Sequence, residues 1–370
     1  MSLLTPFNPN FGKVPQLFLD RQQIVDNYVQ ELCNSGQSIN TPYQTTLIYG
    51  VRGSGKTSLL TDITNKIKDQ SDWLVIDLIN NDQIIDNLID NLRIASSSNF
   101  KKVLKQINTL QVGNIGINLS DHEAAQITVL IELLKKLQKQ NKKVLITIDE
   151  VASTPTLQNF AAIYQLLIRQ ELGIAIIMTG LPENISELQN NKVLTFLLRS
   201  NRIELSALKS SSIINAFQEN FEKGQRQISS PIATQLTSLT KGYAYAFQLL
   251  GYLIWQQTEP NDIIDEKIIQ QVKPEYQRQL NNNVYSLIYR SLSAKDREFI
   301  KAMANISSGQ IKLADIAKQT QHASNYWSMY RKRLIDQQII KNVTYGYVSF
   351  NLPLFQEFIK EQAELEKFDF

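Results

Sequence analysis

The chain has 370 residues, of which 43% are hydrophobic and 20% are charged, a composition typical of a globular protein with two or three domains. Its formal net charge of +3 is too small to indicate a nucleic-acid-binding protein by itself. One cysteine, Cys33, and two histidines, His122 and His322, exclude a disulfide framework and the common zinc clusters.

The first residues carry neither the basic start nor the apolar run of a secretory signal. No stretch approaches the run of about 18 apolar residues that a membrane span needs. The single cysteine fits a reducing compartment. We therefore expect a cytoplasmic protein with no membrane partner.

The segment 45–180 alternates short β-branched apolar runs with amphipathic helical patterns, which predicts βαβ units and a parallel sheet. Helical spacing is clearest over Ala124 to Leu137 and Leu157 to Arg169. The predicted strands are Thr45 to Tyr49, Trp73 to Leu78, Val144 to Ile148 and Ile174 to Met178. Between them, the two glycines of Val112 to Leu119 predict a short hairpin or loop.

After Leu205 the strand pattern stops, and Ser206 to Gln271 carries only helical periodicity. From Ser293 onward the pattern predicts two or three short helices, and then two strands about Tyr345-Gly346 within Ile339 to Phe350. A last helix is expected from Leu354. This order of elements is typical of a winged helix-turn-helix.

The segment Gly50 to Thr57 matches the phosphate-binding pattern G-x-x-x-x-G-K-[ST] in full, with an apolar strand before it and a helix after it. Glycines let the backbone N–H groups of such a P-loop point at phosphates, and the helix N-terminus adds a positive dipole. We expect Lys56 to bind the β and γ phosphates of ATP and the Thr57 hydroxyl to bind Mg²⁺. The predicted nucleotide-binding residues here are Gly50, Val51, Arg52, Gly53, Ser54, Gly55, Lys56, Thr57 and Ser58.

Two carboxylates follow the apolar strand at Val144 to Ile148, where the edge of a parallel sheet is expected. We expect Asp149 to hold Mg²⁺ through water and Glu150 to act as the general base on the attacking water. Thr179 ends the next strand and is predicted to contact the γ-phosphate, although Thr-Gly is also ordinary turn chemistry.

These motifs resemble those of the AAA+ ATPases, in the branch of archaeal ATPases and origin-recognition-type initiators. The resemblance covers nearly the whole chain: Pro6 to Gly12 and Leu17 to Arg21 look like the segment before the P-loop, and Ile148 to Glu150 looks like the Walker B motif. It implies an α/β P-loop NTPase (AAA+) parallel-sheet domain over residues 1–205, a helical lid over 206–275 and a winged-helix domain over 276–370.

The resemblance also implies roles for two arginines. Arg21 would lie near the adenine, the alternative being a surface loop. Arg199 falls where such proteins carry an arginine finger for a neighbouring copy, so self-association through the ATP site is expected; Arg199 and Arg202 could equally be solvated or paired to acids. The sequence departs from the family at the lid helix, because no arginine occurs between Lys241 and Gly251. Tyr243 and its neighbours are therefore interpreted as helix packing.

In the expected C-terminal helix-turn-helix, the second helix would enter the major groove of duplex DNA. Its start would meet bases or phosphates through Ser324, Asn325, Tyr326 and Ser328. Arg331, Lys332 and Arg333 would grip the backbone, with the wing at Tyr345 to Tyr347 along the minor groove. From Arg290 onward there are only twelve basic residues against nine acidic ones. A protein-docking or autoinhibitory role is therefore the alternative.

Together these inferences predict a switch protein that binds ATP or ADP, hydrolyses ATP slowly with Mg²⁺, and couples its nucleotide state to DNA binding. The alternative is a signalling ATPase, similar to STAND proteins, whose winged helix binds protein or holds the ATPase inactive.

Overall fold

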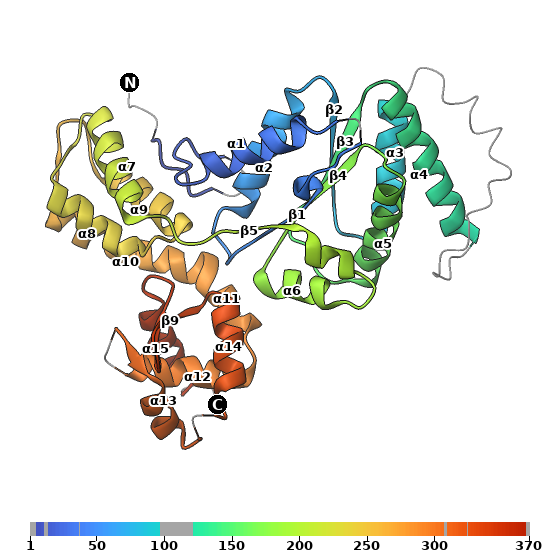
Figure 1. The fold of residues 1–370 in the computed structure, drawn as a ribbon. Coiled ribbons are helices and arrows are strands. Elements are labelled where there is room, and N and C mark those ends of the chain that lie inside the picture. The colour runs from blue at the N-terminus through green and yellow to red at the C-terminus, as the bar shows by residue number, and fades with distance from the viewer. Residues whose placement is uncertain are drawn as a thin grey trace. The chain divides into compact units, whose positions relative to one another are not determined.

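The computed structural model describes residues 5–10, 14–36, 38–96, 121–306, 309–323 and 325–367 (Figure 1). The hairpin or loop predicted at Val112 to Leu119 lies outside these residues. The chain divides into two compact units. We call one the sheet unit, made of Gln23–Tyr49 and Leu59–Glu204, and the other the lid unit, made of Met1–Gln22, Gly50–Ser58 and Leu205–Phe370.

The sheet unit is built on five parallel strands in the order β2-β3-β4-β1-β5. The interior strands β3 and β4 are buried along their whole length, as expected for a sheet covered on both faces. All four strands predicted from apolar runs are confirmed. The strands are β1 (Thr45–Tyr49), β2 (Trp73–Leu78), β3 (Lys143–Ile148), β4 (Ile174–Gly180) and β5 (Asn201–Glu204).

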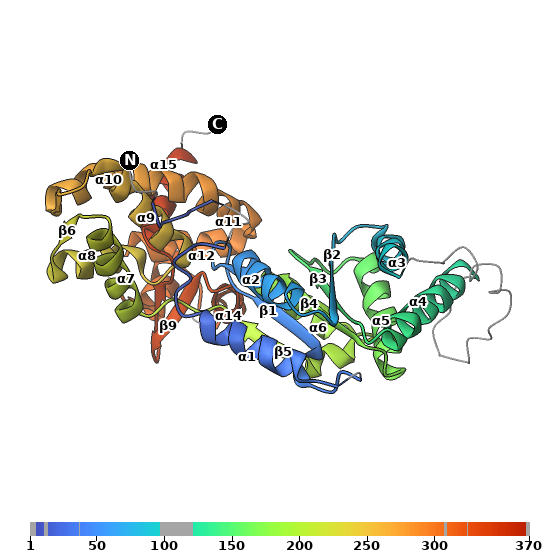
Figure 2. The ribbon, with the colours of Figure 1, turned by 90° about the horizontal axis from the view of Figure 1, so that it is seen from above.

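Helices connect these strands, and Figure 2 shows them along the sheet. Leu88 and Leu92 of α3 are fully buried, and α3 packs against α4 and α5. The two helices expected from apolar spacing are confirmed as α4 and α5. The helices are α1 (Gln22–Cys33), α2 (Lys56–Lys68), α3 (Ile84–Ala95), α4 (Asp121–Lys139), α5 (Pro155–Arg169) and α6 (Pro182–Asn190), with the 3-10 turn η4 (Thr195–Arg199) before β5.

The part of the lid unit that follows Leu205 is helical, as predicted. It also contains a pair of parallel strands, which are only two residues long and were therefore not predicted from the sequence. These strands are β6 (Gln227–Ile228) and β7 (Ile263–Ile264). The helices are α7 (Ser210–Lys223), α8 (Ser230–Thr240), α9 (Ala244–Gln257) and α10 (Glu266–Leu280).

The N-terminal segment of the lid unit is packed into this helical part. Phe7 is 1% exposed, and its ring lies 5.2 Å from that of Phe221 and 5.6 Å from that of Phe247, centroid to centroid. A Cβ on Gly251 in α9 would lie 2.3 Å from the Phe7 ring, so only glycine leaves room for it. Residues far apart in the sequence therefore share one core.

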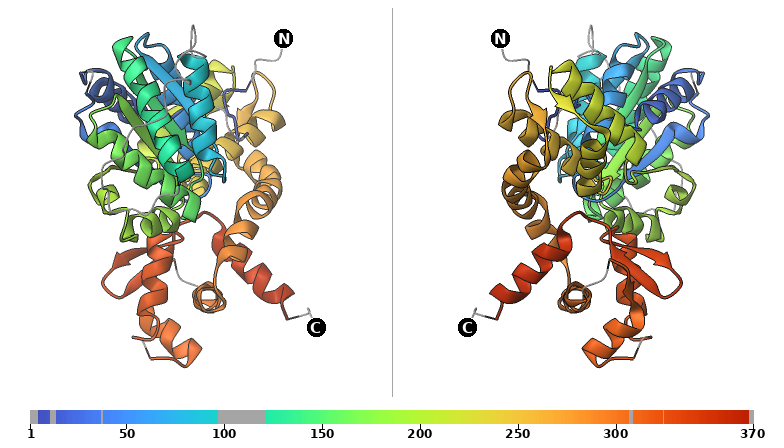
Figure 3. Two further views of the ribbon diagram at one scale, coloured as in Figure 1. Left: turned by 90° about the vertical axis from the view of Figure 1, so that its right-hand side faces the viewer. Right: turned by 90° about the vertical axis from the view of Figure 1, so that its left-hand side faces the viewer.

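The C-terminal part begins where a five-residue π turn, η5 (Asn281–Tyr285), follows α10. The three strands form a sheet in the order β8-β10-β9. Figure 3 shows the longer strands of this sheet as red arrows. The two predicted strands and the last helix are confirmed, and β8 was not anticipated. The elements are α11 (Ser286–Ser291), α12 (Ala294–Asn305), β8 (Ile311–Lys312), α13 (Leu313–Thr320), α14 (Ser328–Asp336), β9 (Ile340–Thr344), β10 (Tyr347–Phe350) and α15 (Phe355–Leu365).

Among the helices of the described residues, each is either too short or too polar to cross a bilayer.

Replacing Phe7 with alanine should lower the free energy of unfolding by about 3–5 kcal/mol, because it empties a fully buried aromatic site. Urea denaturation measures this change. The control Tyr345→Ala removes a fully exposed ring and should change stability by no more than about 0.5 kcal/mol. Equal effects for the two variants would show that the N-terminal segment is not part of the lid-unit core.

Candidate nucleotide-binding site

The P-loop, Gly50 to Thr57, leaves the C-terminal end of β1 and enters α2, which begins at Lys56. Gly53 and Gly55 have φ angles of +72° and +94°, a region that residues with a side chain rarely adopt. The Ser54 N–H donates to the Val51 carbonyl at 3.2 Å and closes the turn. The glycine spacing of the motif is therefore required by the backbone itself.

Lys56 lies over the loop that precedes it. Its Nζ donates to the carbonyl oxygens of Gly50 at 2.9 Å and Val51 at 3.0 Å, and the residue is 9% exposed. Ser54 is 5% exposed, and its hydroxyl has no hydrogen-bond partner within the described residues. A buried hydroxyl without a partner is costly, so the loop offers an unused polar group.

These features fit a bound phosphate chain. A Cβ on Gly55 would meet nothing within 4 Å, so the backbone there is open to a close approach. α2 begins at Lys56, and the first N–H groups of a helix carry the positive end of its dipole. Lys56 adds a cation, and the Ser54 and Thr57 hydroxyls add polar groups. This donor set matches a nucleotide phosphate tail accompanied by Mg²⁺.

The predicted acidic pair lies at the end of β3 in the sheet unit. The parallel register pairs Ile148 with Met178, so Asp149 and Thr179 emerge side by side. The Thr179 hydroxyl donates to Asp149 Oδ1, and the Glu150 N–H donates to the same oxygen at 3.1 Å. Glu150 itself is exposed, with φ +53°. The structure thus brings Asp149, Glu150 and Thr179 together, with Thr179 fully buried and oriented toward Asp149.

Arg21 is held inside the lid unit, where its Nη2 donates to the Ser206 carbonyl at 2.6 Å. The residue is 5% exposed, and burial lowers the pKa of its guanidinium. The neighbouring Asp20 accepts hydrogen bonds from the Lys209 N–H and the Ser212 hydroxyl. The segment that contains Asp20 and Arg21 is therefore hydrogen-bonded to the residues at the start of the lid helices. Because Arg21 is buried, it does not lie in a surface loop.

Arg199 ends the 3-10 turn before β5 and is exposed. Within the described residues its guanidinium has no hydrogen bond or ion pair, whereas the exposed Arg202 donates to the Leu198 carbonyl at 3.0 Å. Of the two arginines considered, Arg199 is thus the one whose charged group is available to another molecule.

Two tyrosines at the start of α9 contact the P-loop, a role that the interpretation as helix packing missed. The Tyr243 hydroxyl donates to the Arg52 carbonyl at 2.6 Å, and the Tyr245 N–H donates to the Gly53 carbonyl at 3.1 Å. Burial raises the pKa of both hydroxyls, so they stay protonated. In the sequence, the signal for this contact was Gly242, which comes directly before the two tyrosines. Its φ of +77° turns the chain from α8 into α9.

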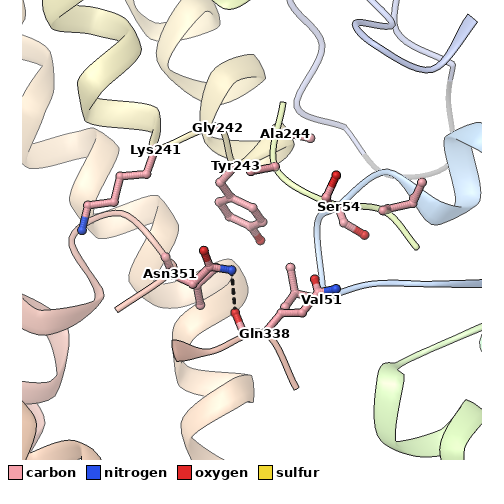
Figure 4. Close-up of a pocket in the computed structure, with 12 residues that line it drawn as sticks. Val51, Ser54, Lys241, Gly242, Tyr243, Ala244, Gln338 and Asn351 are labelled. Atoms are coloured by element: carbon pink, nitrogen blue, oxygen red, sulfur yellow. Dashed lines mark hydrogen bonds between the residues drawn. The ribbon is translucent and has the colours of Figure 1, made fainter. Parts of the chain in front are cut away.

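Figure 4 shows a pocket beside this contact, lined by the P-loop, the start of α9 and the C-terminal part. Val51 and Ser54 come from the P-loop, and Tyr243 extends toward them. On the other side, the Asn351 side chain donates to the Gln338 carbonyl at 2.9 Å. The three segments therefore meet at one place in the lid unit.

In the C-terminal part, only some of the cations expected to contact DNA phosphates, Arg331, Lys332 and Arg333, are exposed and without an ion pair among the residues that the structure describes. Arg333 forms a bidentate ion pair with Asp296, at 3.1 Å from Nε and 2.5 Å from Nη2, and Asp296 is 2% exposed. A buried carboxylate therefore holds the Arg333 guanidinium, and the contact of Arg333 with DNA stays a prediction. Lys332 is exposed, Arg331 is half-buried, and Ser324 lies outside the described residues.

Three aromatic residues near the start of α14 form a cluster of rings. The rings of His322 and Tyr326 lie 4.1 Å apart, and Trp327 packs edge-on to both. Tyr326 stays exposed while Trp327 is buried. Tyr345, at the turn between β9 and β10, is fully exposed.

Two family models match parts of this chain. Residues 24–190 match the family described as the bacterial DnaA ATPase domain, and residues 282–359 match a domain of unknown function, DUF8462. Chromosomal replication initiator proteins DnaA are similar: that of Buchnera aphidicola subsp. Baizongia pistaciae is 28% identical over 117 residues, 32% of this chain, and that of Methylacidiphilum infernorum is 27% identical over 132 residues, 36% of this chain. The matched segments span only 24% and 28% of those relatives.

Two solved structures share the fold over almost their whole length. The Walker-type ATPase PABY2304 of Pyrococcus abyssi is 14% identical with a TM-score of 0.58, covering 93% of this chain and 96% of that one. The ORC2 protein of Aeropyrum pernix, in its ADPNP-ADP complexes, is 13% identical with a TM-score of 0.59, covering 97% and 98%.

The five-stranded parallel sheet and its P-loop define a P-loop NTPase fold. Within that class, the chain has the AAA+ fold of the origin-recognition-like branch, with a sequence similar to the DnaA ATPase domain. The resemblance to the AAA+ ATPases of this branch and the P-loop parallel-sheet fold are confirmed. The winged helix expected at the C-terminus stays a prediction.

Gly53→Ala should destabilise the protein more than Gly55→Ala. Both glycines have positive φ, and each substitution loses about 1–2 kcal/mol for that reason. Only at Gly53 would the new Cβ lie 2.3 Å from the Tyr243 hydroxyl, and such overpacking costs about a further 1–3 kcal/mol. Urea denaturation of the two variants gives the difference. Equal losses would contradict the close contact between Tyr243 and the P-loop.

Proposed function

We propose that this protein is an ATP-hydrolysing switch whose nucleotide is bound by the P-loop. The single observation that carries the proposal is the P-loop backbone, with Gly53 and Gly55 at positive φ, an unpartnered buried Ser54 hydroxyl and Lys56 beside them. The similarity to the DnaA ATPase domain supports it. So does the fold shared with ORC2, which was solved in ADPNP-ADP complexes.

In this proposal, Gly50 to Ser58 bind the phosphates, and Lys56 neutralises the β and γ groups. Thr57 and Asp149 would hold Mg²⁺, which supplies charge neutralisation on the phosphate oxygens when bound. The Thr179 hydroxyl orients the Asp149 carboxylate, with which it forms a hydrogen bond. The exposed Glu150 accepts the proton of the attacking water. Arg21 supports the leading segment on the adenine side through Ser206.

Hydrolysis would be slow in the isolated chain, because the transition state lacks a nearby arginine until copies assemble. Arg199 is the group proposed to act in a neighbouring copy, since its charge is exposed and has no partner within the described residues. A cytoplasmic location belongs to the same proposal and is supported by the single cysteine.

We further propose that the C-terminal part acts as a winged helix that binds duplex DNA in an ATP-dependent manner. Its support is the element order α12-β8-α13-α14-β9-β10, with α14 as the recognition helix and the β9–β10 turn as the wing. Lys332 on α14 and Tyr345 in the wing are exposed. The proposed domains are an AAA+ nucleotide-binding domain over residues 1–205, a helical lid over 206–275 and a winged-helix domain over 276–370.

One observation favours the alternative, a signalling ATPase whose C-terminal part binds protein or holds the enzyme inactive. Arg333, one of three clustered cations on α14, is neutralised by Asp296. The remaining positive charge of the module is small for a dedicated DNA-binding surface. DNA binding measured at physiological salt separates the two functions.

Lys56→Ala should weaken Mg-ATP binding by about 10- to 100-fold, the loss expected for one hydrogen bond to a charged group. Titration calorimetry measures the affinity, and Lys68→Ala at the exposed end of the same helix is the control. Unchanged affinity in Lys56→Ala would refute the P-loop assignment.

Glu150→Gln should retain ATP binding but lower the rate of phosphate release by about 10²- to 10⁴-fold, because the amide cannot accept the proton. A steady-state phosphate assay measures the rate. Turnover equal to that of the parent would exclude Glu150 as the general base.

Lys332→Ala should weaken ATP-dependent retention of duplex DNA and reduce the slope of log affinity against log salt by about 1. Fluorescence anisotropy across a salt series measures both quantities. The control is Lys267→Ala, which removes an exposed lysine from α10. No binding by the parent protein at physiological salt would instead favour the protein-docking alternative.

A further inference from the structure

The two faces of the P-loop backbone have different partners. In a phosphate-binding loop the N–H groups are directed to the ligand, which leaves the carbonyl oxygens of Arg52 and Gly53 for other donors. Here those donors come from the start of α9: Tyr243 Oη at 2.6 Å and Tyr245 N at 3.1 Å. The start of α9 can therefore bind the P-loop through its carbonyl groups and leave its N–H groups available for phosphates.

One of these tyrosines, Tyr245, is also joined to the C-terminal part. The Asn283 side chain donates to Tyr245 Oη at 2.8 Å. Asn283 lies in the π turn η5, and the next residues of that turn are packed into the C-terminal core: Tyr285 is fully buried, donates its hydroxyl to the Pro353 carbonyl and contacts Phe355 of α15, with ring centroids 5.0 Å apart.

We propose that Tyr243, Tyr245 and Asn283 are positioning residues that transmit the conformation of the P-loop to the C-terminal part. The chain of contacts runs from the carbonyls of the P-loop, through the start of α9, to the π turn between α10 and α11. This inference rests on the proposed ATP binding and names how it would be coupled to the C-terminal part. It needs no arginine at the start of α9, which the sequence lacks.

In this proposal, the π turn η5 is the element that would change its conformation. A π turn holds one residue more than an α-helical turn, and such turns are frequently found at functional sites. Conversion of η5 to α-helix would rotate the chain after it by about 100°, the angle of one helical residue. A change at the P-loop that breaks the Asn283–Tyr245 bond would remove a side-chain bond from the π turn, and α11 and the elements after it would turn.

Hydrogen–deuterium exchange of the full chain, with and without Mg-ADP or the Mg²⁺ complex of a non-hydrolysable ATP analogue, tests the link. In the parent protein, the analogue should change the exchange of the amides at 281–285 by at least about fivefold, in the range of ordinary allosteric couplings. Asn283→Ala should abolish this response while the affinity for the analogue stays within about twofold. Asn282→Ala is the matched control: Asn282 is exposed, its side chain has no hydrogen bond within the described residues, and the variant should keep the response.

Tyr245→Phe removes the other partner of the same bond and should behave as Asn283→Ala does. The double variant should be no worse than either single variant, because both substitutions remove one interaction. Tyr243→Phe should also lower the response, and Tyr252→Phe on the same helix should not.

The outcomes separate this inference from the proposed function. If the parent protein does not bind the analogue, both fail. If it binds the analogue but exchange at 281–285 is unchanged, or if Asn283→Ala responds as the parent does, the link is refuted and the proposed ATP binding stands.

Discussion

The P-loop is a backbone that must serve two partners at once. In the proposed function its N–H groups bind phosphates, while its carbonyl groups at Arg52 and Gly53 accept hydrogen bonds from the start of α9. Gly53 makes this possible in two ways, because its φ of +72° is accessible to glycine and because a Cβ would collide with Tyr243. The position of the lid helix therefore depends on the same residue as the phosphate-binding geometry.

The two units contain different parts of the proposed chemistry. The sheet unit presents Asp149, Glu150 and Thr179 at the ends of two parallel strands, as the register of a parallel sheet requires. The lid unit contains the P-loop together with the leading segment, whose Phe7 and Arg21 are buried among lid residues. A nucleotide-dependent change of the P-loop would thus act directly on the unit that contains the C-terminal part.

Much of this could be predicted from the sequence, because local patterns determine it. The buried strands at Val144 to Ile148 and Ile174 to Met178 need runs of apolar or β-branched residues, and the P-loop needs its glycines, so both were found. The bonds of Tyr243 and the ion pair of Arg333 were not, since their partners are 191 and 37 residues away. The two-residue strands were missed because they carry no periodicity.

The central claim is that the backbone of the P-loop holds a triphosphate. A crystal structure of the full chain with Mg²⁺ and a non-hydrolysable ATP analogue tests it most directly. The account predicts density for the three phosphates against the N–H groups of Gly53 to Thr57, with the Lys56 ammonium moved from the Gly50 and Val51 carbonyls onto the phosphates. A nucleotide bound elsewhere, with Lys56 still on those carbonyls, would contradict it.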